Sequence, residues 1–524
     1  MDRQALLKRF AAEFIGLGRV DPVLTINGEP EERRRVYLDT TATALMPQVV
    51  WEGLEQYLAC ASANSHTDAH RAGRDTTQAI EDSRDAMGRL VGYCSKHDVV
   101  LFTANGATGA VNFLARALFR PELRPVIKRF PDGPPRAFVD QLANALGEGG
   151  KQAIDELLAR PLVITTAMEH HSNLLPWMEA VGHHNVRIAK INEATGGLDL
   201  NDLQRILDAE GDRVRLVAVT AVSNVTGIIN PVHDIAAMAH AVGAQILVDG
   251  AQWVPHGTVQ MHPSDNEHAL DYLVLSGHKL YAPGSRGALI GTLSTLSGRR
   301  CVTDVGGGMV EYVSTEDFAI KDEVTAREEA GTPNIPGSIA MGLVAETLMA
   351  IGMETIEHAE QEMTRLLMDT LNAVPNVAVY GGDMDAVPRA GVVSFNVRGF
   401  HHGLVAAYLN DFHNIAVRNQ CFCAQPYVTQ LLQCTGERQQ QVREDMIHGN
   451  HRNIPGMVRA SLGVYSTAED IAALGDALRA LQKDGDAILK LYAPDLDGEY
   501  RRKDGDELPC TYNIKTYIKA WAQS

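Results

Sequence analysis

The middle of the chain alternates short apolar runs with amphipathic stretches of helical periodicity. The runs are rich in β-branched side chains, which is typical of strands buried on both faces of a sheet. We expect strands at Val99–Thr103, Leu162–Ala167, Leu216–Val222, Gln245–Asp249, Tyr272–Leu275 and Ala288–Thr292. A helical stretch such as Asp234–Val242 lies between two of them. The alternation predicts an α/β domain with a mainly parallel sheet, in which ligands bind beyond the carboxyl ends of the strands.

The pattern changes in the last third of the chain. A long helical pattern over Ser338–Ala373 stops before Pro375. It is followed by predicted strands at Val377–Tyr380, Val392–Val397, Ile415–Val417 and Val458–Ser461, and by helices at Gly403–Asp411 and Glu469–Gln482. This block predicts a smaller α+β domain.

These patterns divide the chain into two domains and two additional segments. We expect a large domain over residues 36–340 and a small domain formed by residues 1–35 and 341–483. A Pro-rich insertion interrupts the large domain at about 120–161, and a polar C-terminal extension covers 484–524.

Charge and composition narrow the function classes. The chain has 47 Lys and Arg against 65 Asp and Glu, a formal net charge of −18, which disfavours non-specific binding to nucleic acid or to an anionic membrane. We find no apolar run of the roughly 20 residues that a spanning helix needs. The N-terminus has no uninterrupted apolar core of a signal peptide, so we expect a cytoplasmic protein. The seven cysteines are an odd number spread along the chain, which predicts neither a disulfide framework nor a metal site.

Two polar residues that close neighbouring predicted strands carry the most chemical information. Asp249 ends one strand in the run VDGAQ, and Lys279 follows the next in the run SGHK. Pyridoxal phosphate uses both residue types, because its aldehyde needs a lysine amine and its pyridinium nitrogen needs a carboxylate. The alternative interpretation is a salt bridge at the strand ends. Both residues in this order favour the cofactor.

A glycine-containing turn offers a place for the phosphate. Thr103–Ala110 follows a predicted strand and precedes a helical pattern over Val111–Leu118. The backbone N–H groups of Ala107 and Thr108, with the Thr108 hydroxyl, would face a phosphate at such a helix N-terminus.

At this point the motifs resemble a known family. The sequence is similar to class V aminotransferase-like enzymes, pyridoxal-phosphate proteins of fold type I, and most similar to their cysteine desulfurase and selenocysteine lyase branch. The matching motifs, in chain order over about residues 35–482, are YLDTTAT (37–43), FTANGATGAVN (102–112), MEHHSNLLPW (168–177), SNVTG (223–227), VDGAQ, SGHK, EAGTPN (329–334), RNQCFCAQP (418–426) and RASLGVYSTAEDI (459–471). The resemblance implies a large domain with a mainly parallel sheet and a smaller α+β domain.

The resemblance also implies roles for residues around the cofactor ring. Lys279 would form the Schiff base and, once released by the substrate, act as the base at the substrate α-carbon. Asp249 would pair with the pyridinium nitrogen, and Gln252 would bond to the phenolic oxygen. His170 would stack on the ring and carry protons, and Asn224 would lie beside both cofactor and substrate.

Further roles concern the phosphate and the substrate. Ser276 and His278 resemble additional phosphate ligands. Thr332 resembles a ligand that reaches in from the other subunit, which implies a homodimer with shared active sites. Arg459 resembles the clamp for a substrate α-carboxylate, a role that suits the bidentate guanidinium. We expect His171 to be a satisfied core residue.

Cys423 decides which reaction the resemblance implies. In the similar enzymes a cysteine at this place, before an alanine, attacks the sulfur of bound cysteine. We therefore expect a cysteine desulfurase that converts L-cysteine to L-alanine and leaves a persulfide on Cys423. The sulfur would then pass to an acceptor, for which a partner protein is one candidate. A buried, inert thiol is the alternative for Cys423, against which its polar neighbours Arg418, Asn419 and Gln420 argue.

Some positions depart from the family pattern. Ala107 and Gly109 replace the usual Thr and Glu of the phosphate loop, and Asp39-Thr40-Thr41 replaces Asp-Asn-Ala. Cys421 adds a second thiol before Cys423. Two other readings therefore stay open: another class V reaction, such as that of a C–S or C–Se lyase, an aminotransferase or an epimerase, in which Cys423 is not the nucleophile, or a sulfur-relay protein without turnover.

Overall fold

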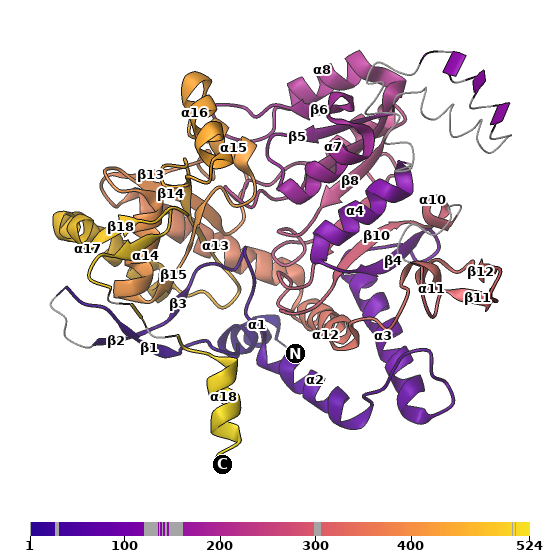
Figure 1. Ribbon diagram of the computed structural model, residues 1–524, viewed down its shortest axis with the longest axis horizontal. Coiled ribbons are helices and arrows are strands. Elements are labelled where there is room, and N and C mark those ends of the chain that lie inside the picture. The colour runs from indigo at the N-terminus through magenta and orange to yellow at the C-terminus, as the bar shows by residue number, and fades with distance from the viewer. Residues whose placement is uncertain are drawn as a thin grey trace.

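The computed structural model describes residues 2–26, 31–119, 161–297, 305–505, 507–508 and 510–524, with isolated positions between 135 and 145. The predicted insertion at 120–161 therefore lies almost wholly outside the described residues. A larger domain and a smaller one lie side by side, as Figure 1 shows.

A seven-stranded sheet forms the centre of the large domain, in the order β4-β10-β9-β8-β7-β5-β6. The strands are β4 (Asp98–Thr103), β10 (Gly287–Thr292), β9 (Tyr272–Ser276), β8 (Gln245–Asp249), β7 (Val214–Thr220), β5 (Leu162–Thr166) and β6 (Val186–Ala189). β10 runs antiparallel to both of its neighbours, β4 and β9, and the other strand pairs in this sheet are parallel. The prediction of a mainly parallel sheet is confirmed. The edge strand β6 was not predicted, because it is short and carries the charged Arg187 in its middle.

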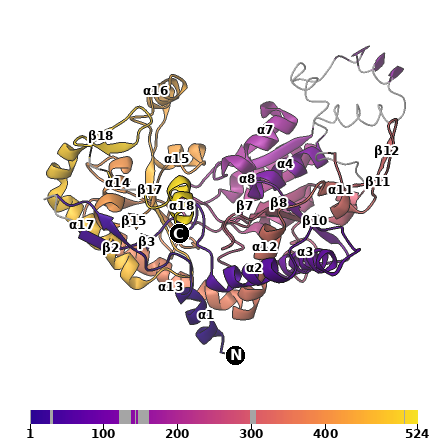
Figure 2. The same cartoon turned by 60° about the horizontal axis from the view of Figure 1, so that its bottom comes forward.

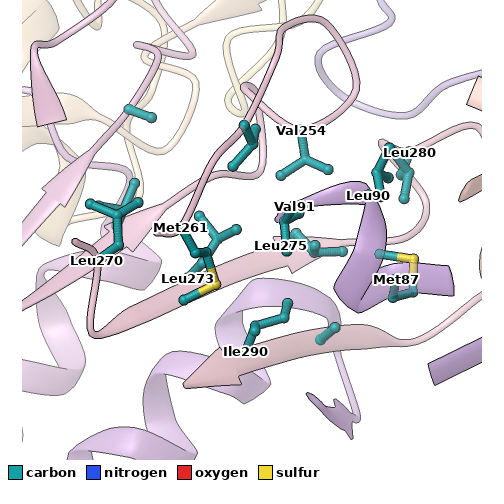
Figure 3. Close-up of a cluster of buried hydrophobic side chains, with 14 of the residues drawn as sticks. Met87, Leu90, Val91, Val254, Met261, Leu270, Leu273, Leu275, Leu280 and Ile290 are labelled. Atoms are coloured by element: carbon teal, nitrogen blue, oxygen red, sulfur yellow. The ribbon is translucent and has the colours of Figure 1, made fainter. Parts of the chain in front are cut away.

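Side chains of the central strands alternate between two hydrophobic clusters, one on each face of the sheet. Along β9, Leu273 and Leu275 belong to one cluster, and Tyr272 and Val274 to the other. Figure 3 shows the first cluster, where Met87 from the end of α3 (Arg71–Leu90) packs near the strand residues. Burial on both faces holds β9 in place, and with it the residues that follow its carboxyl end.

Helices and short segments cover the sheet and complete the large domain. They are α2 (Gln48–Cys60), α4 (Gly106–Leu118), α7 (Leu175–Val181), α8 (Leu200–Glu210), α9 (Val232–Ala241), α10 (Leu293–Ser297) and α11 (Val324–Glu328), with a hairpin of β11 (Val310–Val313) and β12 (Phe318–Ile320).

The long helical pattern after Ser338 is two helices. α12 (Ile335–Ile351) and α13 (Met353–Asn372) meet at Gly352 with a bend of 82°. Gly352 has a φ of +93°, which is strained for any other residue, so the break occurs there. No single helix in the described parts of the chain is long and apolar enough to cross a membrane; this bent pair passes that test only when its two helices are taken together.

The small domain is built on an antiparallel sheet in the order β13-β14-β17-β16. Its strands are β13 (Val377–Val379), β14 (Val392–Val397), β17 (Met457–Ser461) and β16 (Arg418–Gln420), and β15 (Ile415–Ala416) pairs with β3 (Val36–Tyr37) instead. Its helices are α14 (His402–His413), α15 (Gln425–Leu431), α16 (Gly436–Ile447) and α17 (Ala468–Leu491). The polar strand β16 has no apolar pattern and was not predicted.

The two ends of the chain add smaller elements. The N-terminal segment holds α1 (Arg3–Ala12) and a hairpin of β1 (Val20–Val23) and β2 (Glu31–Arg34). The C-terminal segment holds a hairpin of β18 (Tyr492–Pro494) and β19 (Tyr500–Arg502), and then α18 (Ile514–Trp521). α17 continues into the segment that we expected to be a polar extension, because Ile488 is fully buried in the core of the small domain.

Candidate active site

Asp249 and Lys279 lie at the carboxyl ends of two neighbouring parallel strands, β8 and β9, and therefore at the same edge of the sheet. Asp249 closes β8 and pairs in register with Val274 of β9. Burial raises the pKa of the Asp249 carboxyl, against the nearby charge of Lys279 and a hydrogen bond from the Ala251 N–H at 3.0 Å. Within the described residues Asp249 and Lys279 form no ion pair, so the strand-end salt bridge is not made. The buried carboxyl remains available to a cationic partner.

The surroundings of Lys279 favour the free amine. Burial lowers the pKa of Lys279, and the positive charge of Arg459 lowers it further, while Asp249 and Cys423 act in the opposite direction. A neutral amine is the form that attacks a carbonyl carbon or accepts a proton.

His170 is a neutral imidazole in this site. Burial, followed by the charge of Lys279, lowers the pKa of His170 to about 3. Its Nδ1 accepts a hydrogen bond from the Ser172 N–H at 3.1 Å, so the ring proton is on Nε2. An uncharged ring suits stacking on an aromatic cofactor.

Glu169 supports this segment and was missed from the sequence. It is fully buried and accepts hydrogen bonds from Thr166 Oγ1 at 2.6 Å, the Thr220 N–H at 3.0 Å and Asn173 Nδ2 at 2.6 Å. Burial raises its pKa to about 8. These bonds join the ends of β5 and β7 and fix the backbone beside His170.

Two buried amides point to the same region. Gln252 donates from Nε2 to the Thr41 carbonyl at 2.9 Å, while its buried Oε1 has no partner among the described residues. Asn224 donates from Nδ2 to the Phe422 carbonyl at 2.7 Å. Asn224 therefore links the large domain to the loop that carries Cys423.

The phosphate turn has the backbone shape that an anion site needs. Asn105 and Gly106 have φ values of +58° and +65°, and α4 begins at Gly106. A Cβ on Gly106 would lie 2.7 Å from Ser276 Oγ, so glycine is needed for the two strand ends to approach. The Ala107 N–H donates to Ser276 Oγ at 2.9 Å, which leaves the Ser276 hydroxyl proton free for another acceptor.

Two more predicted phosphate ligands lie at this turn. Thr108 is exposed, and its hydroxyl is 2.6 Å from the hydroxyl of Ser172. Ser172 was not predicted from the sequence as a residue of this site. Burial and the charge of Lys279 lower the pKa of His278 to about 4, so its side chain is neutral. Thr332 is exposed in the loop before α12, and its role at a second subunit stays a prediction.

Arg459 is a buried cation with one donor nitrogen, Nε, that has no hydrogen-bond partner among the described residues. It is 3% exposed, and it donates from Nη1 to the Asn224 carbonyl at 2.9 Å and from Nη2 to Asp39 Oδ1 at 3.1 Å. Burial lowers its pKa to about 10, and Asp39 opposes that effect. The guanidinium is therefore charged and retains capacity for an anionic ligand.

The loop between β16 and α15 presents Cys423 to solvent. Phe422 and Ala424 on either side are buried, whereas Cys423 is exposed. Phe422 packs its ring 4.8 Å from the Arg459 guanidinium carbon. Phe422 and Cys423 both have left-handed backbones, with φ values of +53° and +55°. Such strain persists only where the surroundings impose it, and it is typical of functional sites.

His171 anchors this loop at two points. The His171 N–H donates to the Cys423 carbonyl at 2.6 Å, and the Gln425 N–H donates to His171 Nε2 at 3.2 Å. The ring is half-buried and hydrogen-bonded, but it contacts the cysteine loop, so it does more than fill a core. Cys421 is the less accessible thiol, and burial raises its pKa.

The residues present fit pyridoxal phosphate. The site combines the Lys279 amine with its lowered pKa, the buried Asp249 carboxyl without an ion pair among the described residues, and the buried Gln252 Oε1 without a hydrogen-bond partner among them. It also has a glycine-dependent turn at a helix N-terminus, where a phosphate is stabilised by backbone N–H groups. These features meet the separate needs of an aldehyde, a pyridinium nitrogen, a phenolic oxygen and a phosphate.

Comparison with known proteins agrees with this geometry. The chain is 32% identical over 460 residues to a probable cysteine desulfurase of Halalkalibacterium halodurans, which covers 87% of this chain and 95% of that protein. It is 32% identical over 457 residues to a cysteine desulfurase of Cronobacter sakazakii, covering 86% and 94%.

Solved structures show the same fold. The apo cysteine desulfurase of Thermococcus onnurineus has a TM-score of 0.67 at 29% identity, covering 86% of this chain and 95% of that one. The cysteine desulfurase CsdA of Escherichia coli has a TM-score of 0.65 at 24% identity, with the same coverage. This confirms the predicted fold type. Since the sequence model of the aminotransferase class-V family also matches residues 36–127 and 151–474, the chain belongs to that family.

Proposed function

We propose that this protein is a pyridoxal-phosphate-dependent cysteine desulfurase. It converts L-cysteine to L-alanine and holds the sulfur as a persulfide on Cys423. The observation that carries the proposal is the exposed Cys423 thiol, on a loop whose backbone is bonded to His171 and Asn224 and whose Phe422 packs on Arg459. The names of the relatives over most of the chain support the same reaction.

The cofactor would be held by the residues already described. Lys279 binds its aldehyde, Asp249 its pyridinium nitrogen, and Gln252 its phenolic oxygen. His170 stacks on the ring, and Asn224 lies beside it. Ala107, Thr108, Ser276 and His278 surround the phosphate. When bound, the cofactor withdraws electrons from the α-carbon of an attached amino acid, which makes that carbon acidic.

Arg459 orients the amino-acid substrate. Its free Nε–H and the outer face of the guanidinium offer a charge-assisted contact to the substrate α-carboxylate. Asp39 and the Asn224 carbonyl hold the other side of the guanidinium, so its position is set before the substrate arrives. Such preorganisation keeps the substrate sulfur on the side of the Cys423 loop.

Proton transfer falls to Lys279 and His170. The lowered pKa of Lys279 leaves Nζ able to take the proton from the substrate α-carbon. His170 carries its proton on Nε2, and we assign to it the proton transfers near the ring. Both side chains lie at the carboxyl edge of the large sheet.

Cys423 takes the sulfur. Its Sγ attacks the substrate sulfur, so an S–S bond forms while the C–S bond breaks, and the electron pair of that bond stays on the substrate β-carbon. A proton then adds to that carbon. One cysteine and one protein thiol thus give one alanine and one persulfide, and no outside oxidant is needed. The exposed position of Cys423 lets an acceptor, such as a partner protein, collect the sulfur.

The remaining features of the proposal concern the setting of the enzyme. Thr332 contributes to the phosphate site of a second copy, which makes the enzyme a homodimer with shared active sites. We propose a cytoplasmic location, with no role for nucleic acid, membrane or metal.

Replacing Cys423 by alanine tests the function. We expect the rate of alanine formation from L-cysteine to fall about a hundredfold, because the attacking thiol is lost. The visible absorbance of the bound cofactor should not change. Alanine and sulfide are measured in parallel for the two proteins, with Cys421→Ala as the matched control that keeps near-normal rates.

Other outcomes would assign the protein to another reaction. A C–S or C–Se lyase, an aminotransferase or an epimerase keeps its turnover in the Cys423→Ala protein. A cofactor-loaded wild-type protein without any cysteine turnover contradicts the proposed desulfurase, and other amino acids are then tested as substrates.

His171 is expected to act as a positioning residue for the cysteine loop. Replacing His171 by alanine removes the acceptor for the Gln425 N–H, and we expect persulfide formation to slow about tenfold. Cofactor absorbance and the KM for cysteine should stay within about twofold, because the lost hydrogen bond lies at Gln425, while the contacts of Phe422 with Arg459 and Asn224 are kept. His171→Gln restores an acceptor and should recover part of the rate; equal loss in both variants would contradict this role.

A further inference from the structure

The last helix of the chain is not packed into the fold. α18 has no buried residue, and Figure 1 shows it projecting from the bottom of the molecule towards the C-terminus. Ile514, Tyr517, Ile518 and Trp521 recur at helical spacing and form one apolar stripe. Ile514 is 68% exposed and Trp521 is 71% exposed. Stripes of this kind are normally covered by another surface.

Two lysines border the stripe. Lys515 and Lys519 are one helical turn apart, on the same edge of α18. Both are exposed, and neither forms an ion pair within the described chain. A surface that covers α18 should therefore be apolar with acidic side chains beside it.

α2 of the large domain has that combination on its outer side. Trp51 and Leu58 are seven residues apart on one face of this helix, and they are 49% and 51% exposed. Glu52 and Glu55 flank them and are exposed, with no ion pair among the residues that the structure describes. Val50 and Leu54, on the adjoining side of this helix, are buried in the core. The outer face of α2 thus complements α18: each helix offers exposed apolar side chains, and the glutamates of α2 are opposite in charge to the lysines of α18.

We propose that α18 of one copy of this chain packs on the outer face of α2 of a second copy. The two faces lie on one polypeptide, so a pair of copies related by a two-fold axis makes the contact twice and leaves neither face uncovered. Because α18 is exposed in the single chain, it can reach a second copy. Figure 2 shows α18 and the C-terminus from a second direction, in front of the molecule. The contact does not depend on the reaction proposed above.

A charge-exchange experiment tests the contact. One chain carries Lys515→Glu and Lys519→Glu, and a second chain carries Glu52→Lys and Glu55→Lys. Each variant alone pairs like charges at both contacts, whereas a mixed pair matches opposite charges at both. One chain of each mixture also carries an affinity tag, so that the two homodimers and the mixed dimer differ clearly in mass. We expect native mass spectrometry of the co-expressed full-length chains to find more than about four fifths mixed dimers, against one half for random pairing.

The controls separate this contact from its alternatives. All four side chains are exposed, so the fold should be unchanged, and thermal melting of each variant checks this. A mixture of the α18 variant with Glu437→Lys and Glu444→Lys, at exposed sites on α16, should give random pairing. Packing of α18 on its own α2, or on an unrelated protein, gives no excess of mixed dimers in the test mixture; one half or less overturns the proposal.

Discussion

Replacing Lys279 by alanine abolishes the formation of alanine from L-cysteine, with an expected loss of at least about 10⁴-fold. Lys279 supplies the one amine that follows directly from the carboxyl end of β9, opposite the buried carboxyl of Asp249. Its lowered pKa makes that amine available both for attachment of the aldehyde and for proton removal. No neighbouring side chain combines these two properties: Arg459 stays charged, and His170 is a far weaker base.

The measurement is alanine released per enzyme, together with the visible absorbance of the bound cofactor. Lys279→Arg is the informative second variant, because it preserves a positive charge but cannot act as a base. Both variants should be inactive and should lose the covalently attached chromophore. Lys190→Ala, a change of an exposed lysine, is the control and should leave turnover unchanged. Turnover within tenfold of the wild type in Lys279→Ala would contradict the assignment of this residue.

Replacing Arg459 by glutamine lowers kcat/KM for L-cysteine by about a thousandfold, chiefly through KM. Without the guanidinium, the substrate carboxylate is buried with no cationic partner. Removing one partner of a buried ion pair costs about 3–5 kcal/mol of binding free energy. Cysteamine, which is cysteine without the carboxylate, provides the direct test. The wild-type protein should strongly prefer cysteine, and the variant should lose most of that preference.

A purely structural role for Arg459 predicts a different pattern. Asp39 is its ionic partner, so Asp39→Asn removes the same ion pair while leaving the guanidinium in place. We expect Asp39→Asn to retain the preference for cysteine over cysteamine. If Asp39→Asn and Arg459→Gln lose that preference equally, the carboxylate clamp is wrong, and Arg459 serves to join the two domains.

Much of the large domain followed from local sequence patterns. The strands that end at Asp249 and Ser276 are continuous apolar runs, because both faces of the sheet are covered, and a continuous run is easy to recognise. Short polar strands left no such trace. β6 and β16 form because a neighbouring strand supplies their hydrogen bonds, not because of their own composition.

The break between α12 and α13 has only a weak signal in the local sequence. Gly352 stands in the middle of a long helical pattern, and a positive φ there is natural for glycine. The sequence alone does not distinguish this from a tolerated glycine within one helix. The packing of the two helices against different partners decides the bend.

Local periodicity in the sequence determined the α/β class of the large domain, and the residue types at its strand ends singled out Asp249 and Lys279. The resemblance of the motifs to class V aminotransferase-like enzymes supplied the fold type and the other candidate cofactor residues. The tertiary structure alone decided which distant residues meet. Arg459 contacts Asp39 across 420 positions, and His171 reaches Gln425 across 254. Such pairings are set by how distant segments of the chain pack, so no local pattern encodes the support given to Cys423 or to Arg459. Glu169 has two local partners, Thr166 and Asn173, but its bond to the Thr220 N–H depends on the pairing of β5 with β7.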